Sequence, residues 1–375
     1  MKSVLSYASL LLMSAVTYGQ ASSETCQDEG IGTVLEGTEY VLVWSDEFSV
    51  DGAVCSDKWF HQTQFPQGNS WFNGEVQHYT DRLENSYVED GMLKIVAKKE
   101  QFTDQDVTLN YTSARLNSKY AFTGGRVDVR AKLPAGNGTW PAIWTLGRNV
   151  DEPGNYWHEL YGNVSWPACG EIDIMEHWGN DPDVIHGSIH TPSSFGGTIN
   201  TGTTLISDVS NTFHVYSIIW DDSQIKFLVD DVTFYTFRPS PRNSDTWPFT
   251  APQFILLNIA MGGIGGPIDS DFTESMMEID YVRVYEEGNV TGTFDVAQLP
   301  VVSGFAKQGV LTVNNIASRI DGRVLVHTLA GREILSQPIS LPQHQFNVGR
   351  LGLVLVSVLD NDNRVLLSRK IWTGN

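Results

Sequence analysis

Most of the chain between residues 40 and 287 consists of short runs in which apolar and polar residues alternate. The clearest of these runs are Met92–Ala97, Arg126–Leu133, Phe213–Trp220, Ile225–Val229 and Met277–Tyr285. Gly, Pro, Asn and Asp separate the runs, and no segment carries a long helical period. Because successive side chains of a strand point to opposite faces, this pattern predicts many short strands. Such strands, separated by turn residues, form a β-sandwich or a barrel.

The composition changes after residue 287. Residues 288–304 are small and polar and predict a linker, whereas residues 305–375 resume short strands. The runs that predict these strands are Gly309–Val313, Arg323–Leu329, Leu353–Leu359 and Val365–Trp372. From residue 291 onward there are eight basic and five acidic residues, in a chain whose net charge is −20. Such a shift marks a domain boundary, so we expect a small C-terminal β-sandwich domain of residues 305–375 behind a main domain of residues 36–287.

The N-terminus carries the features of an export signal. Lys2 precedes the apolar run Val4–Val16, which is too short to span a membrane. The pattern predicts a secretory signal peptide of residues 1–19, followed by a mature N-terminal segment of residues 20–35. The residues before Cys26 lack the small apolar box of a lipoprotein. We therefore expect a secreted or cell-surface protein that is exported through the periplasm.

The three cysteines are Cys26, Cys55 and Cys169. An exported chain can form a disulfide, and a bond between Cys26 and Cys55 would tie the mature N-terminus to the main domain. Cys169 precedes the acidic segment described below and is expected to be a buried free thiol. The alternative is that all three cysteines are reduced.

The charge restricts the partners of the protein. A net charge of −20 and a pI near 4.7 exclude nucleic acid, because its phosphates require a basic surface. A neutral polysaccharide tolerates an acidic protein, whereas a heavily sulfated one is repelled unless a local basic patch exists.

The segment Gly170–Trp178 places three carboxylates in an apolar run with strand character. Glu171 and Asp173 are two residues apart and share a face, but strict alternation would put Glu176 on the opposite face. A β-bulge around residues 174–175 would return Glu176 to the face of the other two. Three carboxylates on one face of a buried strand repel one another. A purely structural strand does not need such an arrangement, whereas acid/base chemistry uses it.

An exposed acidic edge and a metal site are the other interpretations of the three acids. The apolar residues between the acids indicate that the opposite face is buried, which disfavours an exposed edge. His177 lies off the face of the acids, which leaves an all-oxygen ligand set suited to calcium or magnesium. Two carboxyls about 5–5.5 Å apart serve a retaining glycosidase as nucleophile and acid/base. The middle acid, Asp173, would then hold the protons of the pair apart.

At these residues the chain resembles glycoside hydrolase family 16, in its laminarinase-like subgroup with a bulged catalytic strand. The resemblance extends over Trp44–Phe48, Gly74–Thr80, Tyr111–Arg115, Gly125–Pro134, Thr139–Gly147, Leu257–Gly263 and Ile279–Tyr285, in the order of the family. It implies an all-β, concanavalin-like jelly roll of two curved antiparallel sheets, with the active site in the concave cleft. It also implies that Glu171 is the nucleophile, Glu176 the acid/base and Asp173 the assisting acid.

Seven further residues are expected around the cleft, five of them by the same resemblance and two, Trp166 and His190, from their place near the acids in the sequence. Tryptophans there would stack on the apolar faces of sugar rings, and the polar residues would bind hydroxyls. The histidine among them would hydrogen-bond a hydroxyl or Glu176, or have a structural role. The seven residues are Trp140, Trp144, Trp166, Arg115, Glu75, Asn85 and His190.

Catalysis of this kind needs no cofactor. The family resemblance implies one structural calcium on the convex side, with Glu47, the carbonyl of Gly91 and Asp280 as ligands. Oxygen ligands of this mix suit calcium, which would join the terminal strands of the domain.

The C-terminal region resembles the sorting domain of type IX secretion. The matching segments are Asp321–Val326, Leu329–Ile334, Leu351–Val358 and Leu366–Trp372. The resemblance implies that the type IX secretion machinery is a partner. The sequence departs from the family after Gly352, where an aromatic residue is usual. A carbohydrate-binding module is the alternative, although few aromatic residues are present to stack on sugars.

Together these features predict a secreted, monomeric, retaining endo-β-glucanase that hydrolyses β-1,3-glucan of the laminarin type. One alternative is a hydrolase of an algal galactan (agar, porphyran or carrageenan) or of mixed-linkage β-1,3-1,4-glucan. Another is a non-catalytic glycan-binding protein. Acidic loops such as Asp151–Asn155 disfavour sulfated galactans, and the intact acids disfavour a binding protein without activity.

Overall fold

The computed structural model describes residues 31–35, 38, 40–66 and 68–288, and seven stretches of the C-terminal region. Those stretches are residues 302–307, 310–315, 322–328, 332–339, 343–349, 352–360 and 365–373. The predicted signal peptide, Cys26 and most of the predicted linker lie outside the described residues. No helix within the described part of the chain is long and apolar enough to cross a membrane.

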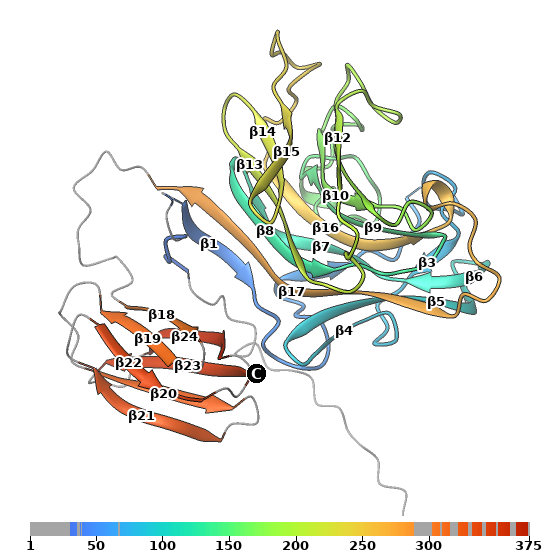
Figure 1. The fold of residues 1–375 in the computed structure, drawn as a ribbon. Coiled ribbons are helices and arrows are strands. Elements are labelled where there is room, and N and C mark those ends of the chain that lie inside the picture. The colour runs from blue at the N-terminus through green and yellow to red at the C-terminus, as the bar shows by residue number, and fades with distance from the viewer. Residues whose placement is uncertain are drawn as a thin grey trace, which may run out of the picture.

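Residues 40–287 form two sheets that pack face to face (Figure 1). The first sheet has the order β15-β14-β13-β8-β17-β5-β6-β3, with β1 beside β17 and β4 beside β5. Its strands are β1 (Tyr40–Asp46), β3 (Gln77–Tyr79), β4 (Ser86–Glu89), β5 (Met92–Asp104), β6 (Val107–Ser113), β8 (Gly125–Lys132), β13 (His214–Trp220), β14 (Ile225–Val229), β15 (Val232–Phe237) and β17 (Glu274–Glu287).

The second sheet has the order β12-β11-β10-β9-β16-β7-β2. Its strands are β2 (Trp59–His61), β7 (Arg115–Phe122), β9 (Thr139–Gly147), β10 (Glu171–His177), β11 (Val184–His190), β12 (Thr201–Leu205) and β16 (Gln253–Met261). Strand pairs in both sheets are antiparallel except β3 with β6. Among the described residues the helices are α1 (His158–Tyr161) and the 3₁₀ turn η1 (Gly263–Gly265).

This architecture confirms the predicted all-β jelly roll. Each of the five alternating runs is a strand, namely β5, β8, β13, β14 and β17. Two strands are longer than predicted: β5 continues to Asp104, and β17 spans Glu274–Glu287. Their outer ends carry mostly polar residues, so the alternation of apolar and polar residues fades there.

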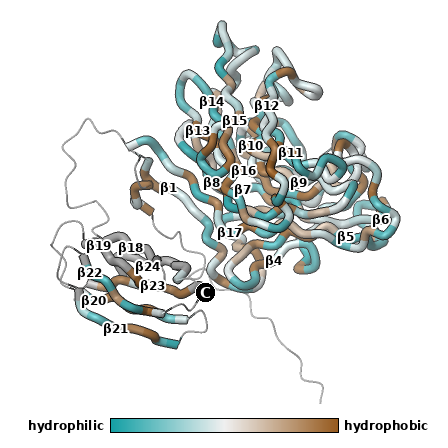
Figure 2. Tube along the Cα trace, viewed as in Figure 1, coloured by the Kyte–Doolittle hydropathy of each residue, from teal (hydrophilic) through white to brown (hydrophobic). Residues whose placement is uncertain are grey.

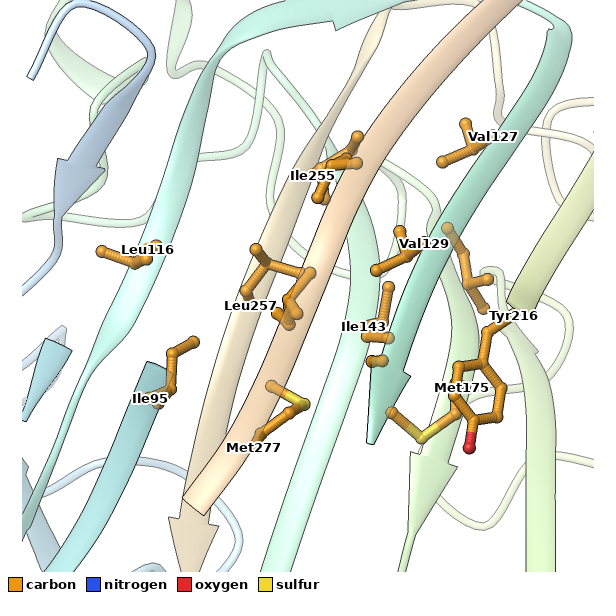
Figure 3. Packing of buried hydrophobic residues seen from close by; sticks show 14 of the residues in the cluster. Ile95, Leu116, Val127, Val129, Ile143, Met175, Tyr216, Ile255, Leu257 and Met277 are labelled. Atoms are coloured by element: carbon orange, nitrogen blue, oxygen red, sulfur yellow. The ribbon is translucent and has the colours of Figure 1, made fainter. Parts of the chain in front are cut away.

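The hydrophobic core lies between the two sheets. Figure 3 shows Met175, Ile143 and Leu257 of the second sheet packed against residues of the first sheet such as Val129 and Met277. All five are fully buried, and burying one such side chain contributes about 1.5–3 kcal/mol. Along the strands, hydrophobic positions recur between hydrophilic ones (Figure 2). The core therefore fixes which side chains of β10 face inward and which face the outer surface.

The C-terminal strands form a separate β unit (Figure 1). A three-stranded sheet has the order β18-β19-β22, and a four-stranded sheet has the order β21-β20-β23-β24. The strands are β18 (Val302–Lys307), β19 (Val310–Asn315), β20 (Gly322–Thr328), β21 (Glu333–Ile339), β22 (Gln343–Asn347), β23 (Leu353–Asp360) and β24 (Val365–Trp372). Leu311 of the three-stranded sheet shares a core with Val324 and Val356 of the four-stranded sheet. Since β18 begins at Val302, the strands start slightly before the predicted boundary, and the domain limits themselves stay predictions.

Candidate active site

Strand β10 contains the predicted bulge. Its pairing register shifts between Asp173 and Met175 relative to β9, and between Asp173 and Glu176 relative to β11. Glu171 lies opposite residue 146 of β9 and Glu176 opposite residue 142, so six residues of β10 face five of β9. Ile174 and Met175 are both buried in the core. The bulge therefore returns Glu176 to the outer face of the sheet that Glu171 and Asp173 occupy.

The three acids lie at a cavity of about 470 Å³. It is lined by side chains of β7, β9, β10 and β16 and of the loops beside them. Six of the predicted cleft residues line this cavity or contact the acids in it. They are Trp140, Trp144, Trp166, Arg115 and Glu75 in the lining, and His190 against the acids.

Two indoles bind the two glutamates of the pair. Nε1 of Trp166 donates a hydrogen bond of 3.0 Å to Oε2 of Glu171. Nε1 of Trp140 donates one of 2.9 Å to Oε1 of Glu176. Trp166 is 40% exposed, so part of its ring is free to meet a ligand. The glutamates are thus each held by an aromatic side chain of the cleft wall.

Burial raises the pKa of all three acids. It raises the pKa of Glu171 well above its ordinary value, and the neighbouring charge of Asp173 adds to this effect. Burial raises the pKa of Asp173 to about 8. Burial, and then Asp173, raise the pKa of Glu176 to about 8, although the indole of Trp140 opposes the shift. Three carboxylates in so small a volume cannot all be charged, so the group retains protons at neutral pH.

His190 contacts different acids from the one we expected. Its Nε2 lies 3.1 Å from Oδ2 of Asp173 and 3.6 Å from Oε1 of Glu171, whereas Glu176 was the acid named among the alternatives expected for it. The reason is the strand register, which puts His190 directly opposite Glu171. Nδ1 of His190 accepts a hydrogen bond of 3.1 Å from the backbone N–H of Gly196. In that tautomer Nε2 carries the proton and is directed at the acids.

The tautomer bears on the metal-site interpretation. Glu171, Asp173 and His190 are close enough together to be considered as metal ligands. However, a histidine whose Nδ1 accepts a backbone N–H has no lone pair left on Nε2 for a metal ion. The hydrogen bond from Gly196 therefore favours acid/base chemistry over a metal centre at this position.

Arg115 is held in a buried network beside the acids. Its guanidinium lies 2.7 Å from Glu152 and donates to Gln62, and it stacks against the rings of Trp71 and Trp144. This network fixes the floor of the cavity, because the ion pair is almost completely buried. Glu152 belongs to the acidic loop noted in the sequence, where nothing in the local pattern indicated a contact with Arg115.

Two further polar groups complete the cavity. Glu75 accepts hydrogen bonds from Gln77 and from the hydroxyl of Tyr79, and burial raises its pKa. Oδ1 of Asn258 accepts a hydrogen bond of 2.7 Å from Nε1 of Trp144, and Asn258 also lines the cavity. Sequence reasoning missed Asn258. A polar residue within the otherwise apolar run Phe254–Met261 was the available signal.

The prediction for Asn85 is wrong. Its side chain is completely buried and does not line the cavity. Its amide donates to the carbonyl of Val96 and to Thr112, and its carbonyl accepts from Thr80 and Arg82. With all of its hydrogen-bonding capacity used inside the first sheet, Asn85 has a structural role.

The register brings the predicted calcium ligands to one region. Asp46 pairs with Val282 and Leu93 with Ile279, which puts Glu47, Gly91 and Asp280 near the middle of β17. Both carboxylates already have arginine partners, because Arg283 binds Glu47 through two nitrogens and Arg130 binds Asp280 at 2.8 Å. An ion there would have to share these carboxylates with the arginines, and the calcium site stays a prediction.

Cys169 is a buried free thiol, as expected. Cys55 takes part in a disulfide. Cys26 lies outside the described residues, so its pairing with Cys55 stays a prediction.

The fold and the acids together define a class of protein. Paired glutamates at the wall of a tryptophan-lined cavity, on the face of a β-sandwich, are the equipment of a glycoside hydrolase. The comparison with family models agrees, since the model for glycosyl hydrolases family 16 matches residues 72–283. The chain belongs to this family.

Several of its relatives are glucanases. The "Beta-glucanase" of Rhodothermus marinus is 40% identical over 258 residues, which cover 65% of this chain and 84% of the relative. The "Glucan endo-1,3-beta-glucosidase A1" of Niallia circulans is 35% identical over 66% of this chain, but only 38% of its own length is matched. The structure of LamAcat from Zobellia galactanivorans is 50% identical, with a TM-score of 0.61, over 67% of this chain and 98% of that one.

Proposed function

We propose that this protein is a secreted, retaining endo-β-1,3-glucanase that hydrolyses glucans of the laminarin type. The observation that carries the proposal is the pair Glu171 and Glu176, each bound by a tryptophan at the edge of one cavity. The names of several relatives, among them two glucan endo-1,3-beta-glucosidases, support the substrate class. A related structure from Zobellia galactanivorans, 50% identical, holds laminaritriose and laminaritetraose.

Glu171 is the nucleophile in this proposal. Burial raises its pKa, but the N–H of Trp166 opposes this shift and stabilises the anion, while Asp173 and Glu176 each hold one of the protons that the three acids retain. The Glu171 carboxylate attacks the anomeric carbon while the bond to the leaving oxygen breaks. The product of this step is a covalent glycosyl-enzyme ester.

Glu176 is the acid/base. Its pKa of about 8 keeps it protonated at neutral pH, so that it can give its proton to the leaving oxygen. After the leaving sugar departs, the ionised Glu176 takes a proton from water. The resulting hydroxide equivalent attacks the ester, releases Glu171 and leaves the anomeric configuration unchanged.

The cavity favours a neutral glucan over a sulfated galactan. Among the described residues that line it, Arg115 is the only lysine or arginine, and Glu152 already neutralises its charge. A sulfate group would therefore find no available cation there. Release of reducing ends from laminarin, mixed-linkage glucan, agarose and carrageenan tests the substrate class. Early proton NMR of the products tests retention, because the β-anomer must accumulate first.

Asp173→Asn is expected to lower kcat about ten- to a thousand-fold while KM changes little. The variant keeps the shape of the side chain but removes the charge that Asp173 acquires as it ionises near pH 8, and this charge helps to raise the pKa of Glu176. The alkaline limb of the pH profile should therefore move to lower pH. Asp183→Asn, an exposed aspartate of the following loop, is the matched control. Wild-type turnover and an unmoved profile in Asp173→Asn would show that the middle acid is structural.

Export and sorting belong to the same proposal. The signal peptide delivers the chain to the periplasm, and the C-terminal domain directs it through the type IX machinery to the surface. The separate cores of the two β units support an independent role for the C-terminal unit.

Removal of residues 302–375 is expected to leave kcat/KM on soluble laminarin nearly unchanged, because β18 begins at Val302. In the native host, the truncated enzyme should accumulate in the periplasm, as fractionation and immunoblotting would show. A collapse of activity in vitro would place the C-terminal unit in the active fold. Loss of binding to insoluble glucan alone would instead support a carbohydrate-binding module.

A further inference from the structure

The indole of Trp144 has contacts on two sides that fix its orientation. The guanidinium of Arg115 lies over the ring, 4.8 Å from its centre, and Nε1 donates a hydrogen bond of 2.7 Å to Oδ1 of Asn258. Trp144 lies opposite Asp173 in the strand pairing and lines the cavity. One face of the ring is therefore occupied, and the hydrogen bond determines the angle at which the rest of the ring meets the cavity.

This hydrogen bond is the first of three that form a continuous row. Nδ2 of Asn258 donates a hydrogen bond of 3.1 Å to the hydroxyl of Tyr79, and that hydroxyl donates one of 2.9 Å to Oε2 of Glu75. Trp144, Asn258 and Glu75 line the cavity. Tyr79 is almost completely buried beneath it and is not part of the lining. We call these four residues the Tyr79 relay.

The chemistry of its members gives the relay a single direction. An indole N–H can only donate, so the amide of Asn258 must turn its oxygen to Trp144 and its nitrogen to Tyr79. The phenol oxygen then accepts the amide N–H, and its one proton is left for Oε2 of Glu75. Removal of the phenol hydroxyl would therefore break the relay in the middle and leave every other member in place.

The phenol itself is held firmly. Its ring packs against that of Trp71, with 4.7 Å between the ring centres, and both belong to a small core with Phe65. Burial raises the pKa of Tyr79 well above its ordinary value, so the hydroxyl keeps its proton at neutral pH. Gln77 donates a second hydrogen bond to Oε2 of Glu75, which steadies the end of the relay. The relay therefore links the angle of the indole to a rigid anchor below the cavity.

We propose that Tyr79 is a positioning residue, which acts through Asn258 on the indole of Trp144 and sets the angle at which that ring meets a bound glucan. The inference rests on the proposed function, because it takes Trp144 to contact the substrate. Tyr79 is buried away from the cavity, and the hydrogen bonds of the relay do not reach the three acids. A broken relay should therefore weaken substrate binding and leave the chemical steps nearly unchanged.

Tyr79→Phe removes one oxygen atom and keeps the ring that packs on Trp71. The variant is expected to raise KM for laminarin about three- to tenfold, because the buried amide of Asn258 loses its acceptor and no longer fixes the indole. We expect kcat to change by less than about twofold. In the Glu171→Ser background, isothermal titration should show a rise of the same size in Kd for a 1,3-linked glucotetraose.

A double-mutant cycle tests whether the effect passes through Trp144. Trp144→Phe keeps an aromatic ring but has no N–H, so the relay ends at Asn258. In that background, Tyr79→Phe should raise KM by less than about 1.5-fold. The proposal is overturned by an equal rise in the two backgrounds, by an unchanged KM in Tyr79→Phe, or by a fall in kcat as large as the rise in KM.

Tyr216→Phe is the matched control. Tyr216 is also completely buried, but its hydroxyl has no hydrogen-bond partner among the described residues, so KM and kcat should stay at the wild-type values. Thermal melts check the fold of each variant. If Tyr79→Phe does not fold, Asn258→Leu takes its place in the cycle, because it breaks the same relay without leaving a buried amide unpaired.

The proposed function is tested separately by the wild-type enzyme. If the wild-type enzyme releases no reducing ends from laminarin, the proposed function is wrong. If the wild-type enzyme is active and the cycle gives one of the contrary results, only the role of Tyr79 is wrong.

Discussion

Glu171→Ser is expected to abolish hydrolysis, with kcat lowered by roughly four orders of magnitude or more, because the covalent step loses its nucleophile. Oligosaccharide binding and the melting temperature should be preserved. The serine removes one buried carboxylate from a group of three, which relieves repulsion. It also removes the acceptor of the Trp166 hydrogen bond, but Trp166 is 40% exposed and its N–H can bind water instead. Isothermal titration with a 1,3-linked glucotetraose and a reducing-sugar assay measure the two properties separately.

Glu159→Ser, at an exposed glutamate of α1, is the matched control and should retain wild-type turnover. If Glu171→Ser keeps more than about a few per cent of the wild-type turnover, Glu171 is not the nucleophile.

Glu176→Gln should show the second largest effect, a fall in kcat on laminarin of about 10²–10⁴-fold. The glutamine cannot protonate the leaving oxygen. It also cannot take a proton from water in the second step. The wild-type enzyme should lose activity as the pH rises through about 8, where Glu176 loses its proton, and this limb should be absent from the variant.

The β-fluoride of a 1,3-linked glucobiose separates the two roles of Glu176, because fluoride leaves without protonation. Glu176→Gln should therefore form the glycosyl-enzyme rapidly from the fluoride and then accumulate it, which intact-protein mass spectrometry detects. Azide is an anion and needs no general base, so it should restore turnover and yield the β-glycosyl azide. No rescue by azide, or an α-glycosyl azide as product, would contradict the assignment of Glu176 as acid/base.

The catalytic strand was predictable because its signal is local. The positions of Glu171, Asp173 and Glu176 in one apolar run require a bulge if the three are to share a face, and the register contains that bulge. The jelly roll was predictable for the same reason, since strand alternation is a property of short segments. Longer-range information came from the family resemblance, which placed Trp140 and Arg115 at the cavity.

The errors and omissions concern contacts between distant segments. The partners of His190 depend on how β10 and β11 pair, and the role of Glu152 depends on a loop that folds back onto Arg115. Asn85 was assigned to the cleft by analogy, whereas its neighbours in space are the buried polar groups of the first sheet. No property of a single segment determines these contacts.

The crowded acids also affect the stability of the fold. The pKa of Asp173 is raised from 3.8 to about 8, so the folded chain holds this proton more tightly than the unfolded chain does. Its contribution to stability is complete below about pH 4 and is lost progressively as the pH rises toward 8, because ionisation is easier in the unfolded chain. Near neutral pH, where the enzyme is proposed to work, the raised pKa of Asp173 therefore lowers the free energy of unfolding. The large hydrophobic core between the sheets must offset that tendency, and selection for higher thermal tolerance is expected to act on the core and on surface loops and to leave the acids unchanged.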